Sequence, residues 1–140
     1  MGIPKGKLIA IGGAEDKGSQ LDRDDIHRGN HNFFEAGILR RIVQEAGGIN
    51  ARIEVITTAS TIHYEVGENY LNSFGKIGCT NIGLMHIRNR EDVATEDHNR
   101  RIRNCDCVMF SGGNQLRLTA VFGGTQFLKT FHSHTCEELF

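Results

Sequence analysis

The segment SGGNQ at Ser111–Gln115 joins an apolar, strand-like run to a stretch whose apolar residues have helical spacing. Gly112 and Gly113 allow the backbone to approach a ligand closely and to adopt positive φ angles. Because the free amides of Gly113 and Asn114 open a helix, they carry partial positive charge. The segment therefore predicts a cradle for an anion, either a bound phosphate or the oxyanion of acyl transfer. A tight strand-to-helix turn with Asn114 as an ordinary N-cap explains the same residues, and both interpretations stay open.

Two serines elsewhere are candidate nucleophiles, but neither has the sequence surroundings that nucleophilic catalysis requires. Ser60 ends the segment TTAS, and His63 is the one histidine placed to activate it. A helix start with Ser60 or Thr61 as its N-cap is the simpler interpretation. Ser133 stands between two histidines but lacks a preceding strand and small flanking residues. We therefore identify no catalytic serine or histidine in this chain.

Three polar segments contain residue types that bind metals or substrates. Gly12–Lys17 (GGAEDK) brings two acids and a lysine to a predicted strand end, and it equally suits a solvated turn. Asp22–Asn32 (DRDDIHRGNHN) gathers carboxylates and histidines without a recognisable ligand spacing, which favours a surface loop. The histidines and cysteine of His132–Cys136 are interpreted as solvated chain near a terminus. Since dinucleotide and P-loop glycine patterns are also lacking, we expect neither a metal nor a cofactor.

Hydrophobic patterning predicts four strands that alternate with four helices. Short apolar or β-branched runs predict the strands, and apolar residues three and four apart predict the helices. The predicted strands are Lys7–Ile11, Arg52–Thr57, Thr80–His86 and Asp106–Phe110. The predicted helices are Phe33–Ala46, Ile62–Lys76, Thr95–Asn104 and Asn114–Phe122.

This alternation predicts βαβ units and a parallel sheet. The expected fold class is α/β, with a three-layer, doubly wound and mainly parallel sheet. Ligands bind such sheets beyond the carboxyl ends of the strands, where the connecting loops meet. The loops at 12–17, 57–60 and 111–115 are therefore expected to share one site.

Length and charge narrow the class of protein. The 140 residues suit one domain, and 39% hydrophobic with 24% charged residues is typical of soluble globular proteins. Sixteen basic and seventeen acidic residues leave a net charge of −1, so no basic field favours nucleic acid or a membrane surface. The opening MGIPKGKLIAIGG has an apolar core too short for a signal peptide or a membrane span. We expect a cytoplasmic protein without nucleic-acid or membrane partners.

Four spaced stretches resemble one family of proteins. They are PKGKLIAIGGAEDK at Pro4–Lys17, FFEAGILRRIVQEAGG at Phe33–Gly48, VITTAS at Val55–Ser60 and FSGGNQLRLTA at Phe110–Ala120. In this order the chain resembles the cyanophycinase family of serine peptidases, which also contains peptidase E. The resemblance runs from Pro4 to about Lys129, and it is specific because several motifs agree.

The resemblance implies a class I glutamine amidotransferase-like fold of the flavodoxin type. It implies a serine exopeptidase that cuts cyanophycin, a poly-aspartate carrying arginine on each side chain, into β-aspartyl-arginine dipeptides. It also implies that Gly113 and Asn114 are candidate oxyanion donors and that Gln115 and Gly112 border the substrate. Family members are typically dimers, so a homodimer is expected.

The chain departs from the family pattern after the fourth predicted strand and its helix. Family members continue into a strand and a Gly-Thr-Ser-Ala-Gly type elbow that carries the nucleophile, with the histidine later still. No such elbow occurs here, and the ending FHSHTCEELF does not resemble the family's continuation. We expect residues 1–130 to be the N-terminal part of a cyanophycinase-like domain, truncated before the elbow, and 131–140 to be an atypical tail produced by a frameshift or truncation.

These departures leave more than one functional interpretation. The first is a cyanophycinase-type hydrolase chain that lacks its nucleophile and is inactive alone. The second is a non-catalytic α/β domain that binds a small acidic or arginine-bearing ligand or pairs with another subunit. The third is a product without function, whose uncovered strand edge at Asp106–Phe110 drives association.

Overall fold

A three-stranded parallel sheet forms the middle layer of the protein in the computed structural model, which describes residues 3–4, 6–11 and 37–137. The strand order is β3-β2-β4. Ile53, at the start of the central strand, pairs with both Ile82 and Cys107, so all three strands begin in register. The strands are β2 (Ile53–Ile56), β3 (Ile82–Met85) and β4 (Cys107–Phe110), which confirms the second, third and fourth predicted strands.

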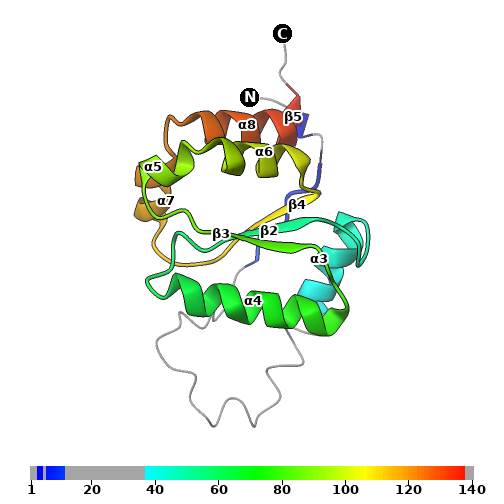
Figure 1. The fold of residues 1–140 in the computed structure, drawn as a ribbon. Helices are drawn as coiled ribbons and strands as arrows, with labels where there is room; N and C mark the ends of the chain where they lie inside the picture. The colour runs from blue at the N-terminus through cyan, green and yellow to red at the C-terminus, as the bar shows by residue number, and fades with distance from the viewer. Residues whose placement is uncertain (1–2, 5, 12–36, 138–140) are drawn as a thin grey trace.

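Helices cover both faces of this sheet, which makes the fold α/β with three layers (Figure 1). One face is covered by α3 (Leu39–Ala46) and α4 (His63–Ile77). The opposite face is covered by α5 (Arg90–Val93), α6 (Glu96–Asn104), α7 (Gln115–Phe122) and α8 (Gln126–Thr135). The four predicted helices are confirmed within the described residues, and α5 and α8 were not predicted. Residues 33–36 of the first predicted helix lie outside the described part of the chain.

A glycine follows each of α3 and α4 and ends the helix. Gly47 follows α3 with a φ of 116°, a left-handed conformation that glycine adopts at little cost. The amide of Gly48 donates to the carbonyl of Val43 at 2.8 Å, so a carbonyl of the last turn is satisfied. Gly78 ends α4 in the same way, with a φ of 105°.

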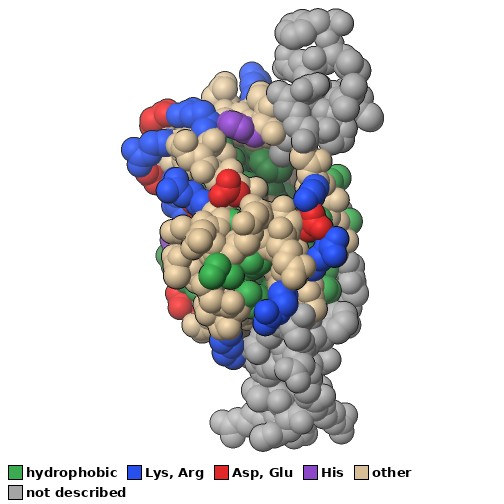
Figure 2. Space-filling model, turned by 90° about the vertical axis from the view of Figure 1, so that its right-hand side faces the viewer, with side chains coloured by type: hydrophobic (Ala, Val, Ile, Leu, Met, Phe, Trp, Pro, Cys, Tyr) green, Lys and Arg blue, Asp and Glu red, His purple; other side chains and the backbone are tan. Residues whose placement is uncertain are grey.

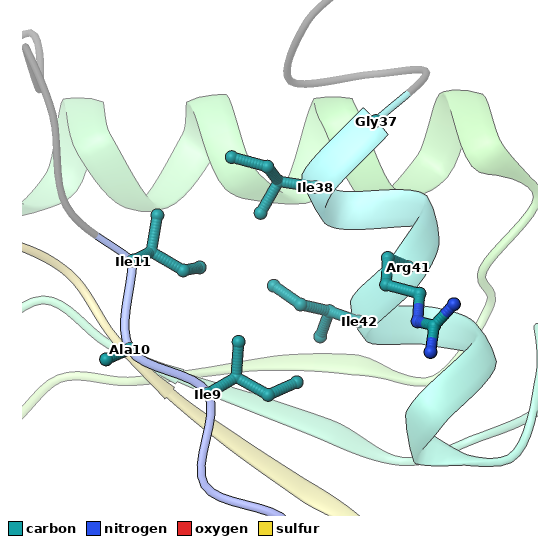
Figure 3. A pocket seen from close by; sticks show the side chains of 7 residues that line it. All are labelled: Ile9, Ala10, Ile11, Gly37, Ile38, Arg41 and Ile42. Carbon is teal, nitrogen blue, oxygen red and sulfur yellow. The ribbon is translucent and has the colours of Figure 1, made fainter.

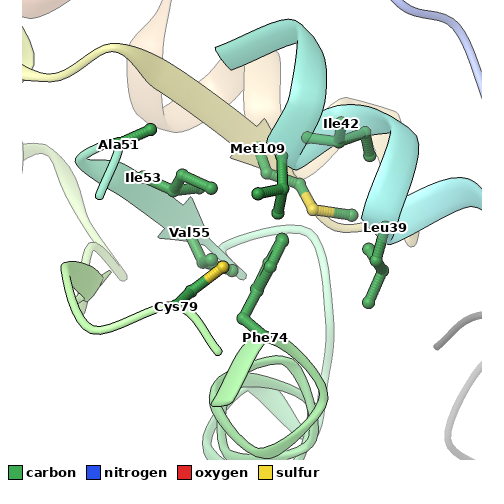
Figure 4. Packing of buried hydrophobic residues seen from close by; sticks show 9 residues of the cluster. Leu39, Ile42, Ala51, Ile53, Val55, Phe74, Cys79 and Met109 are labelled. Carbon is green, nitrogen blue, oxygen red and sulfur yellow. The ribbon is translucent and has the colours of Figure 1, made fainter. Parts of the chain in front are cut away.

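Each face of the sheet has its own apolar core because successive strand residues point to opposite sides. Ile53 and Val55 of β2 point toward α3 and α4, where they pack with Phe74 and Leu39 (Figure 4). The cluster consists of Leu39, Ile42, Val43, Ala51, Ile53, Val55, Phe74, Cys79 and Met109. Ile56 instead joins the second cluster under the other helices, with Met85, Ile87, Val93, Ile102, Val121, Phe122 and Phe127.

Glu54 is a buried acid on the central strand and belongs to the second face. Its side chain is 5% exposed, and its carboxylate receives Arg101 of α6 through two bonds, Nε to Oε1 at 3.1 Å and Nη2 to Oε2 at 2.5 Å. The same guanidinium donates to the carbonyl of Leu84 at 3.0 Å. Gly83 leaves room for the pair, since a Cβ there would collide with both side chains. This fork-like ion pair ties α6 to the sheet.

The predicted strand at Lys7–Ile11 is wrong. Residues 7–11 form neither strand nor helix, and Leu8 and Ile9 are 92% and 45% exposed. A strand needs a ladder partner, and both sides of β2 are already taken by β3 and β4. The run lies beside α3 instead, where Ile9 and Ile11 point into a hollow that Ile38 and Ile42 also line (Figure 3). Apolar composition predicted the strand, but no edge of the sheet pairs with it.

Two further features lie around the sheet. β1 (Ile3–Pro4) and β5 (Cys136–Glu137) pair as a short antiparallel ladder, which the sequence did not predict. β4 pairs with β2 only, so in the described residues its other edge is open. Phe110 at the end of β4 is 37% exposed and borders an apolar hollow of about 210 Å³ between α7 and α8.

The surface carries both signs of charge. Figure 2 shows basic and acidic side chains interspersed on one side of the molecule rather than gathered by sign. None of the helices in the described part of the chain is long and apolar enough to cross a bilayer.

Candidate functional site

Three loops meet at the carboxyl edge of the sheet, on the left in Figure 1. The amide of Ser111, after β4, donates to the carbonyl of Ile56 at 3.0 Å. Asn114 donates its amide to the carbonyl of Ala59 at 3.0 Å, which joins the same loop to the one after β2. Thr58 donates its hydroxyl to the carbonyl of Ile87 at 2.5 Å, which brings in the loop after β3. The expected meeting of the 57–60 and 111–115 loops is confirmed, whereas the loop at 12–17 lies outside the described residues.

Gly113 is required by the close contact between two of these loops. Its φ is 145°, and a Cβ at this position would collide with the carbonyl oxygen of Ala59. The backbone of the SGGNQ turn thus lies directly against the TTAS loop, in a conformation that L-residues rarely adopt. Glycine at this position is explained by packing between the loops, whether or not a ligand binds.

The amides of the SGGNQ turn are used unequally. Asn114 donates its own amide to Ala59, and its side-chain oxygen accepts from the amide of Leu116 at 2.9 Å, so Asn114 is the N-cap of α7. The amide of Gly113 has no acceptor among the described residues. Gln115 is exposed as the first residue of α7. Of the two predicted oxyanion donors, Gly113 therefore has the unused N–H.

Neither candidate serine is placed to act as a nucleophile. Ser60 is buried, and its hydroxyl oxygen accepts from the amide of Ile62 at 3.2 Å, a local turn. His63 makes no hydrogen bond to Ser60, because its Nδ1 accepts from Arg88 and its Nε2 has no partner among the described residues. Ser133 lies on the exposed surface of α8, where its hydroxyl donates to the carbonyl of Lys129 at 2.9 Å. A serine within a helix has no strand-to-helix elbow to expose it.

His63 is the buried titratable group at this edge. It is 8% exposed, and Nη2 of Arg88 lies 3.2 Å from its Nδ1. Burial lowers the pKa of His63 below its ordinary value, and the nearby charges of Arg88, His86 and Arg117 lower it further. A neutral ring is therefore favoured, and its Nε2 has no partner among the described residues.

Two arginines act electrostatically on this histidine. Arg88 follows β3, and its guanidinium lies over the ring of Tyr64 at 5.7 Å from the ring centroid. Arg117, on the first turn of α7, donates to the carbonyl of Ser60 at 3.1 Å. The ring of His86 lies 4.9 Å from that of Tyr64, between centroids. Within the described residues no carboxylate forms an ion pair with either arginine.

Arg88, Arg117 and His86 are the residues that sequence reasoning missed. The loops after the first, second and fourth predicted strands were examined, but the loop after the third was not. Arg88 stands in that loop, two residues beyond the predicted strand end at His86. Reading every loop at the carboxyl edge would have found Arg88, because parallel strands end at one edge.

Among the described residues, the other predicted sites contain no catalytic or metal-binding group. A hollow of about 400 Å³ beside α3 is lined by Ile9, Ala10, Ile11, Gly37, Ile38, Arg41 and Ile42, and it contains no nucleophile (Figure 3). His132 and His134 lie in the last turn of α8. In the described part of the chain, His, Cys, Asp and Glu side chains form no group of three suited to a metal ion. The cluster at Asp22–Asn32 lies outside the described residues.

Three cysteines of the described residues are buried or half-buried free thiols. Cys79 is buried in the first core cluster, and burial raises the pKa of its thiol. Burial also raises the pKa of Cys107, and together with Glu54 it raises the pKa of Cys105 to about 11. Thiols with raised pKa values are weak nucleophiles at neutral pH, so these residues add no reactive group to the site.

A polar edge of a parallel α/β sheet, with loops that meet and an unused backbone donor, is the kind of site that α/β hydrolases and ligand-binding proteins share. Comparison with known proteins narrows this class. The chain is 36% identical over 124 residues to the cyanophycinases of Synechococcus elongatus and Thermosynechococcus vestitus, and 27% identical over 125 residues to that of Geminocystis herdmanii. No family model matches the chain.

These matches cover 89% of this chain, and the predicted resemblance to cyanophycinases is confirmed. The chain spans 34% of the length of the Synechococcus protein and 40% of the length of the Geminocystis protein.

Proposed function

We propose that this chain contributes to a cyanophycin-degrading serine hydrolase with a glutamine amidotransferase-like fold. The observation that carries the proposal is the joined turn at the carboxyl edge, where the unused amide of Gly113 lies beside the TTAS loop. The similarity to named cyanophycinases supports the substrate class. Under this proposal the protein acts in the cytoplasm on cyanophycin or on β-aspartyl peptides.

The proposal assigns a role to each residue of the turn. Gly113 donates its amide to the oxyanion, because its N–H, unlike that of Asn114, has no acceptor among the described residues. Asn114 holds the turn against Ala59 and caps α7, which fixes the direction of that donor. Gly112 and Gln115 are exposed on either side and contact the substrate.

Catalysis also requires a nucleophile and a base, and the described residues do not bring a serine and a histidine together. A missing nucleophile removes the covalent route altogether, whereas a missing oxyanion donor costs about 10²–10³ in rate. We therefore expect this chain alone to bind cyanophycin without releasing dipeptide.

Co-sedimentation with insoluble cyanophycin, followed by an assay of soluble β-aspartyl-arginine, tests both parts. The expected result is sedimentation of the chain with the polymer and no dipeptide release. Gln115→Ala is expected to weaken sedimentation, whereas the matched change Gln126→Ala, at the exposed start of α8, leaves it unchanged. Dipeptide release that survives both Ser60→Ala and Ser133→Ala would overturn the assignment of roles.

A second candidate function is non-catalytic binding of a small acidic or arginine-bearing ligand. The cationic cluster at the carboxyl edge, with no nucleophile beside it, favours this alternative. Binding of β-aspartyl-arginine without hydrolysis of cyanophycin, by a protein of the same length as the relatives, would favour this alternative over the hydrolase.

The expected homodimer stays a prediction, which light scattering after size-exclusion chromatography checks.

A further inference from the structure

Two arginines at the carboxyl edge, Arg88 and Arg117, have no acidic partner among the described residues, in contrast to Arg101 of α6, which is paired with Glu54. With described residues, the side chain of Arg88 makes one hydrogen bond, to His63, and its face lies on Tyr64. The side chain of Arg117 likewise makes one within the described part of the chain, to the carbonyl of Ser60. A guanidinium has five N–H donors, so both arginines keep donors that a ligand can use.

The contact between Arg88 and His63 fixes which ring nitrogen carries the hydrogen. Arginine stays protonated in proteins, so Nη2 of Arg88 donates and Nδ1 of His63 accepts. In the neutral ring Nε2 then carries the hydrogen. This Nε2–H is enclosed, since His63 is only 8% exposed, and it lacks an acceptor among the described residues. A buried donor without an acceptor is unfavourable, and a ligand oxygen relieves it.

Other groups around the cluster add to its preference for an anion. His86 faces Tyr64, and the helices α4 and α7 both begin at this edge, with their partial positive charge. Asp92 of α5, just after this loop, is already used, since its Oδ2 accepts from the amides of Arg88 and Asn89 at 2.8 and 3.3 Å.

We propose that Arg88 and Arg117, together with His63, form a subsite for a peptide carboxylate. The planar forks of two arginines match a carboxylate in shape and charge. The identity of the carboxylate rests on the proposed function: in cyanophycin each arginine is linked through its amino group, so its own carboxylate is free. The subsite then recognises the arginine carboxylate of the β-aspartyl-arginine unit.

Calorimetric titration of the full chain tests this subsite with two matched probes, β-aspartyl-arginine and its arginine amide, which lacks that carboxylate. We expect the amide to bind at least tenfold more weakly than the acid. Arg88→Leu and Arg117→Gln are each expected to weaken the acid at least tenfold while changing the binding of the amide less than twofold. Arg103→Gln is the control, since Arg103 is exposed on α6 and paired with Glu96, and it should leave both probes unchanged.

Nuclear magnetic resonance of the His63 ring gives a readout that loss of folding does not imitate. In the free chain the Nε2 atom should show the protonated, neutral tautomer. The acid probe should shift the Nε2 signal and raise the pKa of His63, and the amide probe should do neither. Arg88→Lys keeps the charge but loses the fork, so it should bind the acid with an affinity between wild type and Arg88→Leu.

The outcomes separate this inference from the proposed function. Equal affinity of wild type, Arg88→Leu and Arg117→Gln for β-aspartyl-arginine overturns the subsite and leaves the hydrolase proposal standing. Arg88-dependent binding of N-acetyl-aspartate without preference for β-aspartyl-arginine supports a carboxylate subsite and contradicts the cyanophycin assignment. Tighter binding of inorganic phosphate than of either carboxylate overturns the subsite as proposed.

Discussion

Arg101 and Arg88 lie in two environments that differ in what satisfies the positive charge. Arg101 lies against the sheet with its fork on the buried carboxylate of Glu54. Arg88 lies at the carboxyl edge with a neutral histidine and an aromatic ring as its partners. The first arrangement is complete within the chain, whereas the second leaves positive charge for a ligand. The closed ion pair has a structural role, whereas the open cationic cluster is a candidate ligand site.

Each environment also depends on a glycine that brings groups close together. Gly83 makes room for Glu54 and Arg101, and Gly113 makes room for the carbonyl of Ala59. At Gly83 the obstructing atoms are ends of side chains, whereas at Gly113 they belong to the backbone of another loop. Side-chain ends can move aside, whereas the backbone of a packed loop cannot. We therefore expect position 83 to tolerate an added methyl group better than position 113.

The largest expected effect comes from breaking the closed pair. Arg101→Leu leaves Glu54 buried without its partner, and we expect a loss of about 3 kcal/mol in the free energy of unfolding. Replacing both residues by leucine should recover stability to within about 1 kcal/mol of wild type, because no buried charge remains. Urea denaturation measures both variants. A double variant as unstable as the single one would show that the pair is needed for more than charge compensation.

The two glycines give the next effect. Gly113→Ala is expected to destabilise the chain by about 1–3 kcal/mol, because φ is 145° and the new Cβ meets the Ala59 carbonyl. Gly83→Ala should cost less, about 1–2 kcal/mol, as its obstacles are side-chain ends. Gly75→Ala serves as a control within α4, where space is open and alanine should stabilise by about 0.5–1 kcal/mol. Thermal unfolding of the three variants ranks them, and equal effects at 83 and 113 would contradict the distinction.

The pH dependence of stability tests whether the His63 ring of the open cluster is held neutral. The pKa of His63 is lowered in the folded chain from 6.5, so below pH 6.5 the unfolded chain binds a proton that the folded chain does not. Stability contributed by the neutral ring is thus present above pH 6.5 and is lost as pH falls toward the lowered pKa. His63→Gln should flatten this dependence between pH 6.5 and 5, by less than about 1 kcal/mol at pH 5. Identical pH profiles of wild type and variant would show that the ring is not held neutral.

The smallest effect is expected for the open arginine itself. Arg88→Leu removes one hydrogen bond at an exposed position and no ion pair, so stability should change by about 0.5 kcal/mol or less. Urea denaturation beside Arg101→Leu makes the contrast direct. A loss as large as that of Arg101→Leu would mean that Arg88 supports the fold rather than a ligand.

Sequence patterning predicted most of the elements for a clear physical reason. Ile53–Ile56 and Cys107–Phe110 are largely apolar, short and bounded by polar turns, and the helices that follow them have apolar residues at helical spacing. Period and propensity are local properties, so they are readable without the fold. Gly47 and Asn114 were likewise predictable as helix boundaries, because capping chemistry involves residues only a few positions apart.

Pairing and position were decided by the tertiary structure. Lys7–Ile11 has the composition of a strand but no ladder partner, and ladder partners are far away in sequence. Glu54 gave no sign that it would be buried, since its partner Arg101 lies 47 residues further along the chain. The sequence by itself determined a parallel α/β fold and the glycine turn at 112–113, because both depend on neighbouring residues. Only the tertiary structure decided which amide stays unused and which arginines lack an acid, because those facts depend on residues that meet across three separate loops.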